Sequence, residues 1–289
     1  MMNPNQNSDS VEATATTIVN GNEQSLTEKY ISTNSDESAI LVENGGNATI
    51  SNAVIDKSSG NSTNTENSEF YGVNAGILVK SNSTATIKNA IISTNAKGSN
   101  AVFSTGTDSK IYISDSTITT EGESSSRGLD ATYEGYIEAD NVKISTKGGS
   151  CAALATDRGE GTIIAKNSNF ETNGAGSPVI YSTGNISITD SSGSNGGNVT
   201  LNAVNQVMEG NIELDNISTL KMNLSDNSSY EGTINSENTA KNISLKIDNS
   251  SKIKLTGDFY VTSLEDEDAN YNNIDFNGFR LYVNGVAIN

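Results

Sequence analysis

A repeat of 26 residues runs through the first two thirds of the chain and limits the folds that the sequence can adopt. Apolar residues recur at this step at Ile92, Ile118, Ile144 and Phe170, and Ile55 lies 37 residues before Ile92. Self-similarity at a fixed period of this size is typical of a solenoid, in which each repeat stacks on its neighbours. The same alignment places a last recognisable copy near residue 193.

Three short apolar segments occupy each copy. Seven and five residues before each anchor the chain is apolar, and the residue between is mostly polar or amphipathic, which is the period of a strand with one buried face. These two columns consist of Ala48, Ile50, Ala85, Ile87, Ile111, Ile113, Ile137, Ala139, Ile163, Ala165, Ile186 and Ile188. A second strand carries the anchor and a third opens the copy, as at residues 77–79. Three short strands per copy predict an all-β parallel β-helix, whereas a leucine-rich repeat would need an apolar helix or convex segment that no copy contains.

A column of Asn and Asp lies three residues before the anchors. Both residue types tolerate left-handed backbone angles and hydrogen-bond to their own turn backbone. The column consists of Asn52, Asn89, Asp115, Asn141, Asn167 and Asp190. We interpret it as the corner between two strands, which is a structural role.

Charge and composition exclude several functions. The net charge of −18 opposes binding to nucleic acids or anionic membranes, because such surfaces require clustered Lys and Arg. Cys151 is the only cysteine, so no internal disulfide can form, and the absence of histidine removes the usual activator of a thiol nucleophile. No stretch is long and apolar enough for a membrane span, and we expect an extracellular or cell-surface protein whose signal peptide has been removed.

We expect the chain to form one solenoid domain whose two ends differ from its repeats. We expect residues 1–10 to be disordered, 11–38 to form an N-terminal cap or an atypical first rung, 39–254 to form the rungs, and 255–289 to form a C-terminal cap, with an insertion loop at 58–69. Caps are expected because open strand edges invite aggregation.

An acidic column stands ten residues before the anchors. Asp108, Glu134 and Glu160 follow Asn82 in successive copies, and Asp130 and Asp157 lie three or four residues before two of them. Rungs about 4.8 Å apart would stack these carboxylates, and Ca²⁺ takes oxygen ligands at about 2.3–2.6 Å. Two readings stay open here: a solvated acidic edge, or a calcium site made by these five residues.

The repeated phrases ATIKNAIIST (residues 85–94) and YISDSTITT (112–120), with the ending LTGDFYVTSL and NIDFNGFRLYVNG, carry a resemblance. They resemble secreted bacterial carbohydrate-binding β-helix proteins of cellulose-degrading clostridia and, more broadly, the pectate-lyase-like solenoid class. This resemblance implies a right-handed parallel β-helix, bound calcium, and affinity for plant polysaccharides such as cellulose and acidic pectin.

Four tyrosines are candidates for stacking on sugars, namely Tyr112, Tyr133, Tyr136 and Tyr181. We therefore expect a non-catalytic carbohydrate-binding protein, monomeric or weakly oligomeric, with polysaccharide as its partner and calcium as its cofactor. The alternatives are a cell-surface adhesin or structural stalk, and a calcium-dependent polysaccharide lyase. A lyase would need a Lys or Arg base beside the acidic column, where Lys110 and Arg158 stand.

Overall fold

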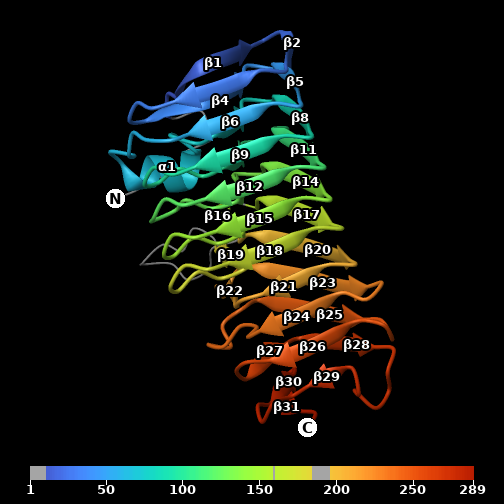
Figure 1. Ribbon diagram of the computed structural model, residues 1–289. Coiled ribbons are helices and arrows are strands. Elements are labelled where there is room, and N and C mark those ends of the chain that lie inside the picture. The colour runs from blue at the N-terminus through green and yellow to red at the C-terminus, as the bar shows by residue number, and fades with distance from the viewer. Residues whose placement is uncertain (1–10, 159, 184–195) are drawn as a thin grey trace.

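The computed structural model is a parallel β-helix with three long sheets that run along the solenoid (Figure 1). It describes residues 11–158, 160–183 and 196–289. In this part of the chain, sheet A has eight strands, and sheets B and C have ten each. Every strand pair within these three sheets is parallel, because successive coils add strands to the sheets in turn, and the last coils extend only sheets B and C. The all-β solenoid predicted from the repeat is confirmed.

The strands of each sheet are given in order along the solenoid. Sheet A consists of β1 (Thr14–Asn20), β4 (Glu37–Glu43), β7 (Ile77–Lys80), β10 (Val102–Thr105), β13 (Leu129–Thr132), β16 (Leu154–Asp157), β19 (Ile180–Thr183) and β22 (Ile212–Leu214). Sheet B consists of β2 (Glu23–Leu26), β5 (Asn47–Ser51), β8 (Thr84–Lys88), β11 (Lys110–Ser114), β14 (Tyr136–Asp140), β17 (Thr162–Lys166), β20 (Asn198–Val204), β23 (Thr219–Ser225), β25 (Asn242–Ile247) and β28 (Ser263–Asp266).

Sheet C consists of β3 (Lys29–Ser32), β6 (Val54–Lys57), β9 (Ile91–Thr94), β12 (Thr117–Thr120), β15 (Lys143–Thr146), β18 (Asn169–Thr172), β21 (Val207–Glu209), β24 (Ser229–Gly232), β26 (Lys252–Leu255) and β29 (Ile274–Asp275). A fourth, small sheet at the C-terminal end contains β27 (Phe259–Val261), β30 (Leu281–Val283) and β31 (Val286–Ala287). One helix, α1 (Thr65–Tyr71), leaves the coils between sheets C and A.

The anchors of the repeat form one continuous column inside sheet C. Ile55 pairs with Ile92, and the pairing continues through Ile118 and Ile144 to Phe170. All five side chains are buried in the core that fills the narrow interior. The extra residues between the first two anchors contain helix α1, which explains why that interval is 37 residues rather than 26.

The Asn/Asp column forms the predicted corner between sheets B and C. Asn52, Asn89, Asp115 and Asn141 all adopt the left-handed conformation, with φ between 50° and 55°. Their side chains hydrogen-bond from coil to coil: Asn141 Nδ2 donates to Asp115 Oδ1 over 2.8 Å, and Asn89 Nδ2 donates to Asn52 Oδ1 over 3.4 Å. A residue type that relieves strain at one corner therefore also links neighbouring coils.

The ends differ in part from their expected boundaries. Residues 11–38 supply β1, β2 and β3 and so complete a first coil. At the other end, β28 and β29 still extend sheets B and C beyond residue 254, and only the small fourth sheet departs from the coil pattern.

The coil after β17 lies further along the chain than the repeat alignment places it. Val199 and Leu201 of β20 pair with Ile163 and Ala165. The copy that the alignment places around residues 186–193 falls outside the described residues, as do residues 1–10.

Two neighbouring isoleucines allow the buried column to be tested against a matched control. Ile92 is fully buried, whereas Ile91 next to it is 57% exposed. We expect Ile92→Ala to lower the free energy of unfolding by about 2–5 kcal/mol, because it leaves a cavity in the core. Ile91→Ala should change it by less than about 0.5 kcal/mol. Guanidinium unfolding followed by circular dichroism measures both, and equal losses would contradict the assigned inward and outward faces.

Candidate functional site: a groove on sheet A

The outer face of sheet A changes character along the solenoid. Strand pairing aligns one outward-facing column, which consists of Leu41, Leu78, Phe103, Asp130, Ala155, Tyr181 and Glu213. The first three are apolar and buried, and they form a small cluster on the outside of the sheet with Ala75. Beyond them the column becomes polar, so this face has an apolar half and a polar half.

Helix α1 covers the apolar half. Its N-cap Asn64 accepts a hydrogen bond from the Asn67 backbone N–H, and its C-cap Gly72 adopts φ 68°. A Cβ at Gly72 would lie 2.5 Å from the Phe103 ring, so glycine allows the chain both the left-handed turn and the close approach to sheet A. Thr132 Oγ1 donates to the Phe70 carbonyl over 2.9 Å and so fixes the helix to β13. The end of α1 thereby forms a wall above the polar half.

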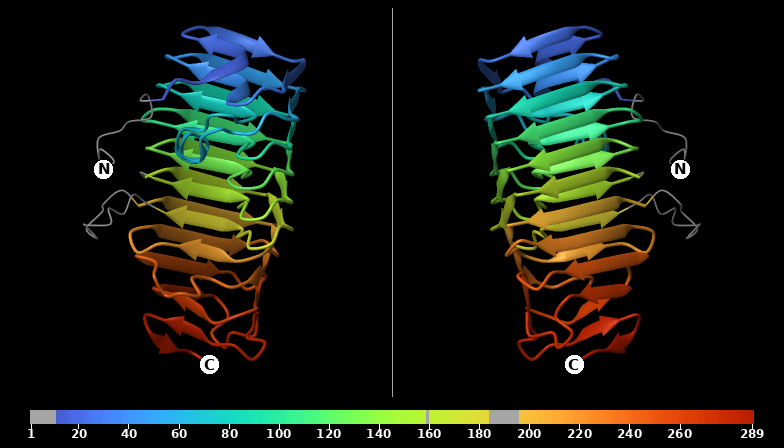
Figure 2. Two further views of the ribbon diagram at one scale, coloured as in Figure 1. Left: turned by 90° about the vertical axis from the view of Figure 1, so that its left-hand side faces the viewer. Right: turned by 90° about the vertical axis from the view of Figure 1, so that its right-hand side faces the viewer.

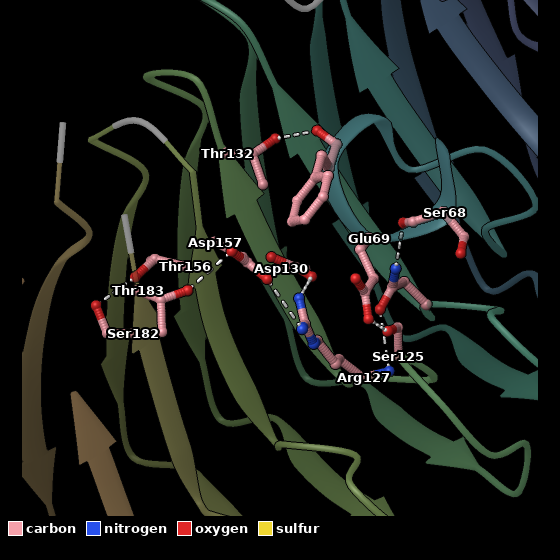
Figure 3. A network of polar contacts seen from close by, with 12 residues as sticks. Ser68, Glu69, Ser125, Arg127, Asp130, Thr132, Thr156, Asp157, Ser182 and Thr183 are labelled. Carbon is pink, nitrogen blue, oxygen red and sulfur yellow. Dashed lines mark hydrogen bonds and ion pairs between the residues drawn. The ribbon is translucent and has the colours of Figure 1, made fainter. Parts of the chain in front are cut away.

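A buried ion cluster lies at the boundary between the two halves (Figure 3). Arg127, only 5% exposed, donates from Nη1 to Asp130 Oδ2 over 2.8 Å and from Nη2 to Asp157 Oδ2 over 3.1 Å. Thr183 Oγ1 donates to the other oxygen of Asp157 over 2.8 Å. The guanidinium carbon also lies 5.3 Å from the centroid of the Tyr181 ring, a cation–π distance. The cluster therefore holds β13, β16 and β19 together beneath Tyr181.

The carboxyl group of Asp130 is the most desolvated member of this cluster. It is fully buried, and its Oδ1 has no hydrogen-bond partner. Burial raises the pKa of Asp130 to about 7, although the neighbouring Arg127 guanidinium acts in the opposite direction. One guanidinium thus balances two carboxylates in a region with little access to water.

Two adjacent cavities make up what we call the sheet A groove, and they share Tyr181 and Glu213. The cavity on the α1 side has a volume of about 410 Å³, and its lining includes Glu69, Lys97 and Arg127. The second cavity has a volume of about 600 Å³. Its lining includes Thr183, Asp215, Asn235, Ser236, Glu237 and Thr239. The groove thus extends from α1 across β19 and β22 on the left-hand side of the solenoid in Figure 1.

The far wall of the groove is a loop held by its own hydrogen bonds. Asn235, in the left-handed conformation at φ 53°, accepts hydrogen bonds at Oδ1 from the backbone N–H groups of Thr239 and Ala240. Its Nδ2 donates to the Tyr260 carbonyl over 3.2 Å, and Thr239 Oγ1 donates to the Leu214 carbonyl over 2.9 Å. These contacts attach the loop to β22 and fix the groove in shape.

Carboxylates dominate the electrostatics of the larger cavity. Its lining includes Glu213, Asp215 and Glu237 but no Lys or Arg among the described residues. Partial burial, together with repulsion from Glu237, raises the pKa of Glu213. The negative charges of this cavity are therefore only partly compensated by the protein itself.

The acidic residues predicted to bind calcium lie in two separate places. Asp108, Glu134 and Glu160 occupy the corner between sheets A and B in consecutive coils, as the register of β11, β14 and β17 requires. All three are exposed and have positive φ. Asp130 and Asp157 instead lie on sheet A, where both bind Arg127.

The corner carboxylates already have other contacts. Asp108 lies 3.5 Å from Lys110 Nζ, and Glu134 accepts a hydrogen bond from Thr107 Oγ1 over 2.8 Å. Within residues 11–158, 160–183 and 196–289, no group of three or more acidic or cysteine side chains converges closely enough to hold a metal ion. The corner column is therefore stacked coil upon coil, and two of its side chains contact other protein groups. Calcium binding there stays a prediction from the sequence.

The four candidate tyrosines occupy three surfaces. Tyr112 and Tyr136 lie on the outer face of sheet B with ring centroids 6.0 Å apart. Tyr133 stacks on Tyr71 of α1 at 5.5 Å. Of the four, Tyr181 is the one that lines the sheet A groove.

Several residues of the groove carry no signal in the repeat pattern. Arg127, Glu69, Glu213 and Glu237 belong to turns, to the insertion or to the later coils, where the 26-residue alignment gives no equivalent positions. One signal was present: Asp130 stands in the column that holds Leu78 and Phe103 in earlier coils. A carboxylate in an apolar column predicts a buried partner, and Arg127 is three residues away.

No protein-family model matches the sequence, and none of the curated proteins matches it significantly. None of the helices in the described residues is long and apolar enough to cross a membrane.

The raised pKa of Asp130 predicts a pH-dependent stability. Between the ordinary value of 3.8 and about 7, the folded protein holds the proton on Asp130 more tightly than the unfolded chain does. The contribution of this group to the free energy of unfolding therefore decreases as pH rises through this range. Asp130→Asn cannot ionise, so its unfolding free energy should fall less steeply between pH 4 and pH 7. Guanidinium titrations across that range measure the slopes.

The exposed Asp108 supplies the control for this prediction. Asp108→Asn also removes one carboxylate but leaves the buried cluster intact, so comparing the two variants separates the effect of the cluster from the effect of the lost charge. If Asp130→Asn has the same pH slope as Asp108→Asn, the assigned environment of Asp130 is incorrect.

Proposed function

We propose that the protein is a non-catalytic polysaccharide-binding protein and that the glycan lies along the sheet A groove. The observation that carries this proposal is the pair of adjacent cavities, which meet at a partly exposed aromatic ring. Ligand sites are concave, and they combine apolar or aromatic surface with a few fixed polar groups. The elongated shape of this groove suits a chain-like ligand better than a small compact one.

The lining supports recognition of hydroxyl groups. The larger cavity contains amide, hydroxyl and carboxylate side chains beside the Tyr181 ring. Such groups can donate to and accept from sugar hydroxyls, while the flat ring covers the apolar face of a sugar. The hydrogen-bonded loop at Asn235 keeps these groups in place before a ligand arrives, which lowers the entropic cost of binding.

Two contacts favour a binding role over lyase activity. The Arg158 guanidinium carbon lies 3.7 Å from the centroid of the Phe70 ring, and Lys110 lies beside Asp108. Both cationic candidates for the proton-abstracting base are therefore engaged with protein groups and lie apart from the groove lining. A general base must reach the proton that it removes.

A structural stalk is the second candidate, and the elongated stack of coils favours it (Figure 2). A stalk requires stacking and solubility but no groove. Binding experiments on a panel of polysaccharides distinguish the two functions, because a structural stalk would bind none of the polysaccharides.

Tyr181 gives the sharpest test of the binding role. We expect Tyr181→Ala to weaken polysaccharide binding about tenfold or more, a loss of about 1.4 kcal/mol, because the groove loses its aromatic surface. Tyr112→Ala removes a 39% exposed tyrosine from sheet B and should leave the affinity unchanged. A glycan array followed by titration calorimetry on the best ligand measures both variants.

Two results would argue against this assignment. Equal losses in the Tyr112 and Tyr181 variants would move the site away from the sheet A groove, and absence of binding to any glycan would favour the stalk. Absorbance of unsaturated sugars after incubation with pectin would indicate a lyase instead.

Calcium dependence stays a prediction from the sequence, and it concerns acidic glycans. The net charge of −18 opposes contact with a polyuronate unless a cation lies between them. We therefore expect affinity for polygalacturonate, if present, to fall sharply in excess chelator, whereas affinity for neutral glycans should not change. Titrations with and without chelator measure this, and unchanged polygalacturonate binding would contradict a calcium bridge.

A further inference from the structure

The charge of the sheet A groove narrows the class of sugar that it can accept. In its larger cavity the described lining has three carboxylates, Glu213, Asp215 and Glu237, and no basic residue. The lining of the smaller cavity contains Lys97 and Glu69, which carry opposite charges, and Arg127, whose guanidinium is paired with Asp130 and Asp157. A ligand that enters the groove thus meets a surplus of negative charge beside an aromatic ring.

Repulsion within the groove gives a cation a specific reason to bind. Glu213 and Glu237 line the same cavity, and partial burial together with the negative charge of Glu237 raises the pKa of Glu213, so the ionised form of Glu213 is destabilised. A positive group placed between them would relieve this repulsion. A negative group would increase it, and a neutral sugar would leave it unchanged.

The side chains around the carboxylates indicate which other chemical groups the ligand must have. Tyr181 lies at the junction of the two cavities, and Asn235, Ser236 and Thr239 supply amide and hydroxyl groups on the opposite wall. A simple cation such as a metal ion would not use the ring, and no group of described residues converges on a metal position. A ligand with both hydroxyl groups and ammonium groups uses all of these features.

We propose that the sheet A groove binds a polysaccharide of cationic amino sugars, with its ammonium groups between Glu213 and Glu237 and a sugar ring against Tyr181. This inference rests on the proposed polysaccharide-binding function and specifies the class of sugar. It predicts the order of preference: amino sugar first, neutral sugar second, uronic acid last.

The test compares four hexasaccharides of similar size by titration calorimetry at pH 6, in excess chelator so that calcium cannot bridge. They are a glucosamine hexamer, its N-acetylated form, a glucose hexamer and a galacturonate hexamer. We expect the glucosamine hexamer to bind at least about fivefold more tightly than the two neutral ones. Its advantage should shrink as salt rises, because salt screens exposed charges.

Two matched double variants test whether the preference for glucosamine arises from the carboxylates of the groove. The double variant Glu213→Gln/Glu237→Gln should lose the preference for glucosamine, so that the glucosamine hexamer binds no more tightly than the neutral hexamers. The double variant Asp108→Asn/Glu160→Gln removes the same number of charges at the corner between sheets A and B, and it should keep the preference. Melting temperatures of both variants verify that each one is folded.

The outcomes separate this inference from the function on which it depends. If no hexamer binds, the polysaccharide-binding function fails. If the neutral or galacturonate hexamers bind as tightly as glucosamine and Tyr181→Ala abolishes binding, the function stands and the amino-sugar preference is wrong. If both double variants lose the preference equally, the attraction comes from net charge and not from the groove, which also overturns the proposal.

Discussion

Pairing of equivalent strands in successive coils is the constraint on which the rest of this structure depends. Ile111 lies beside Ile137 and Ile137 beside Ile163, so a column in the sequence becomes a stripe in space. Because side chains alternate between faces, a shift of one residue in any coil would turn its core outward. The buried stripes fix the strand register, and this register also determines which outward-facing side chains lie next to one another. The stripes on the outer faces of the sheets are therefore built from residues one coil apart.

The outer face of sheet A illustrates the consequence. The same column contains Leu78 and Phe103 where α1 covers it, and Tyr181 and Glu213 where it borders the groove. Helix α1 is encoded by an insertion into the repeat, and it divides the outer face of sheet A into a covered half and an open half. The repeat supplies the floor of the groove, and departures from the repeat supply its walls.

The sequence was sufficient to predict the features that depend on the position of a residue within its coil. The anchors at Ile92 and Ile118, the corner at Asn89 and the stacking of Asp108 on Glu134 all follow from position within a coil, and the structure places them accordingly. Contacts that depend on long side chains crossing between coils were not predictable in this way. Asp130 and Asp157 were assigned to calcium together with the corner acids, because they are near them in sequence.

Their side chains in fact point to another face, where Arg127 binds both. The difference arises because Asp130 lies within strand β13 at an outward position of sheet A, whereas Glu134 lies in the turn that follows this strand. The groove wall at Asn235 lies in later coils with a shorter and less regular spacing, and α1 has no counterpart in the other copies among the described residues. Neither could be placed by analogy with a neighbouring repeat.

The cost of the buried cluster is itself an argument for function. Replacing a buried ion pair with packed apolar residues is often neutral or stabilising, and two coils earlier this chain places Leu78 in the same column as Asp130. A molecule that needed only to stack its coils could have continued with Leu and Phe. Instead, the apolar column ends at the coil where the groove begins, and the Arg127 guanidinium lies over the ring of Tyr181. A charged group held in place against an aromatic ring is what a preorganised binding site requires, and a spacer does not need one.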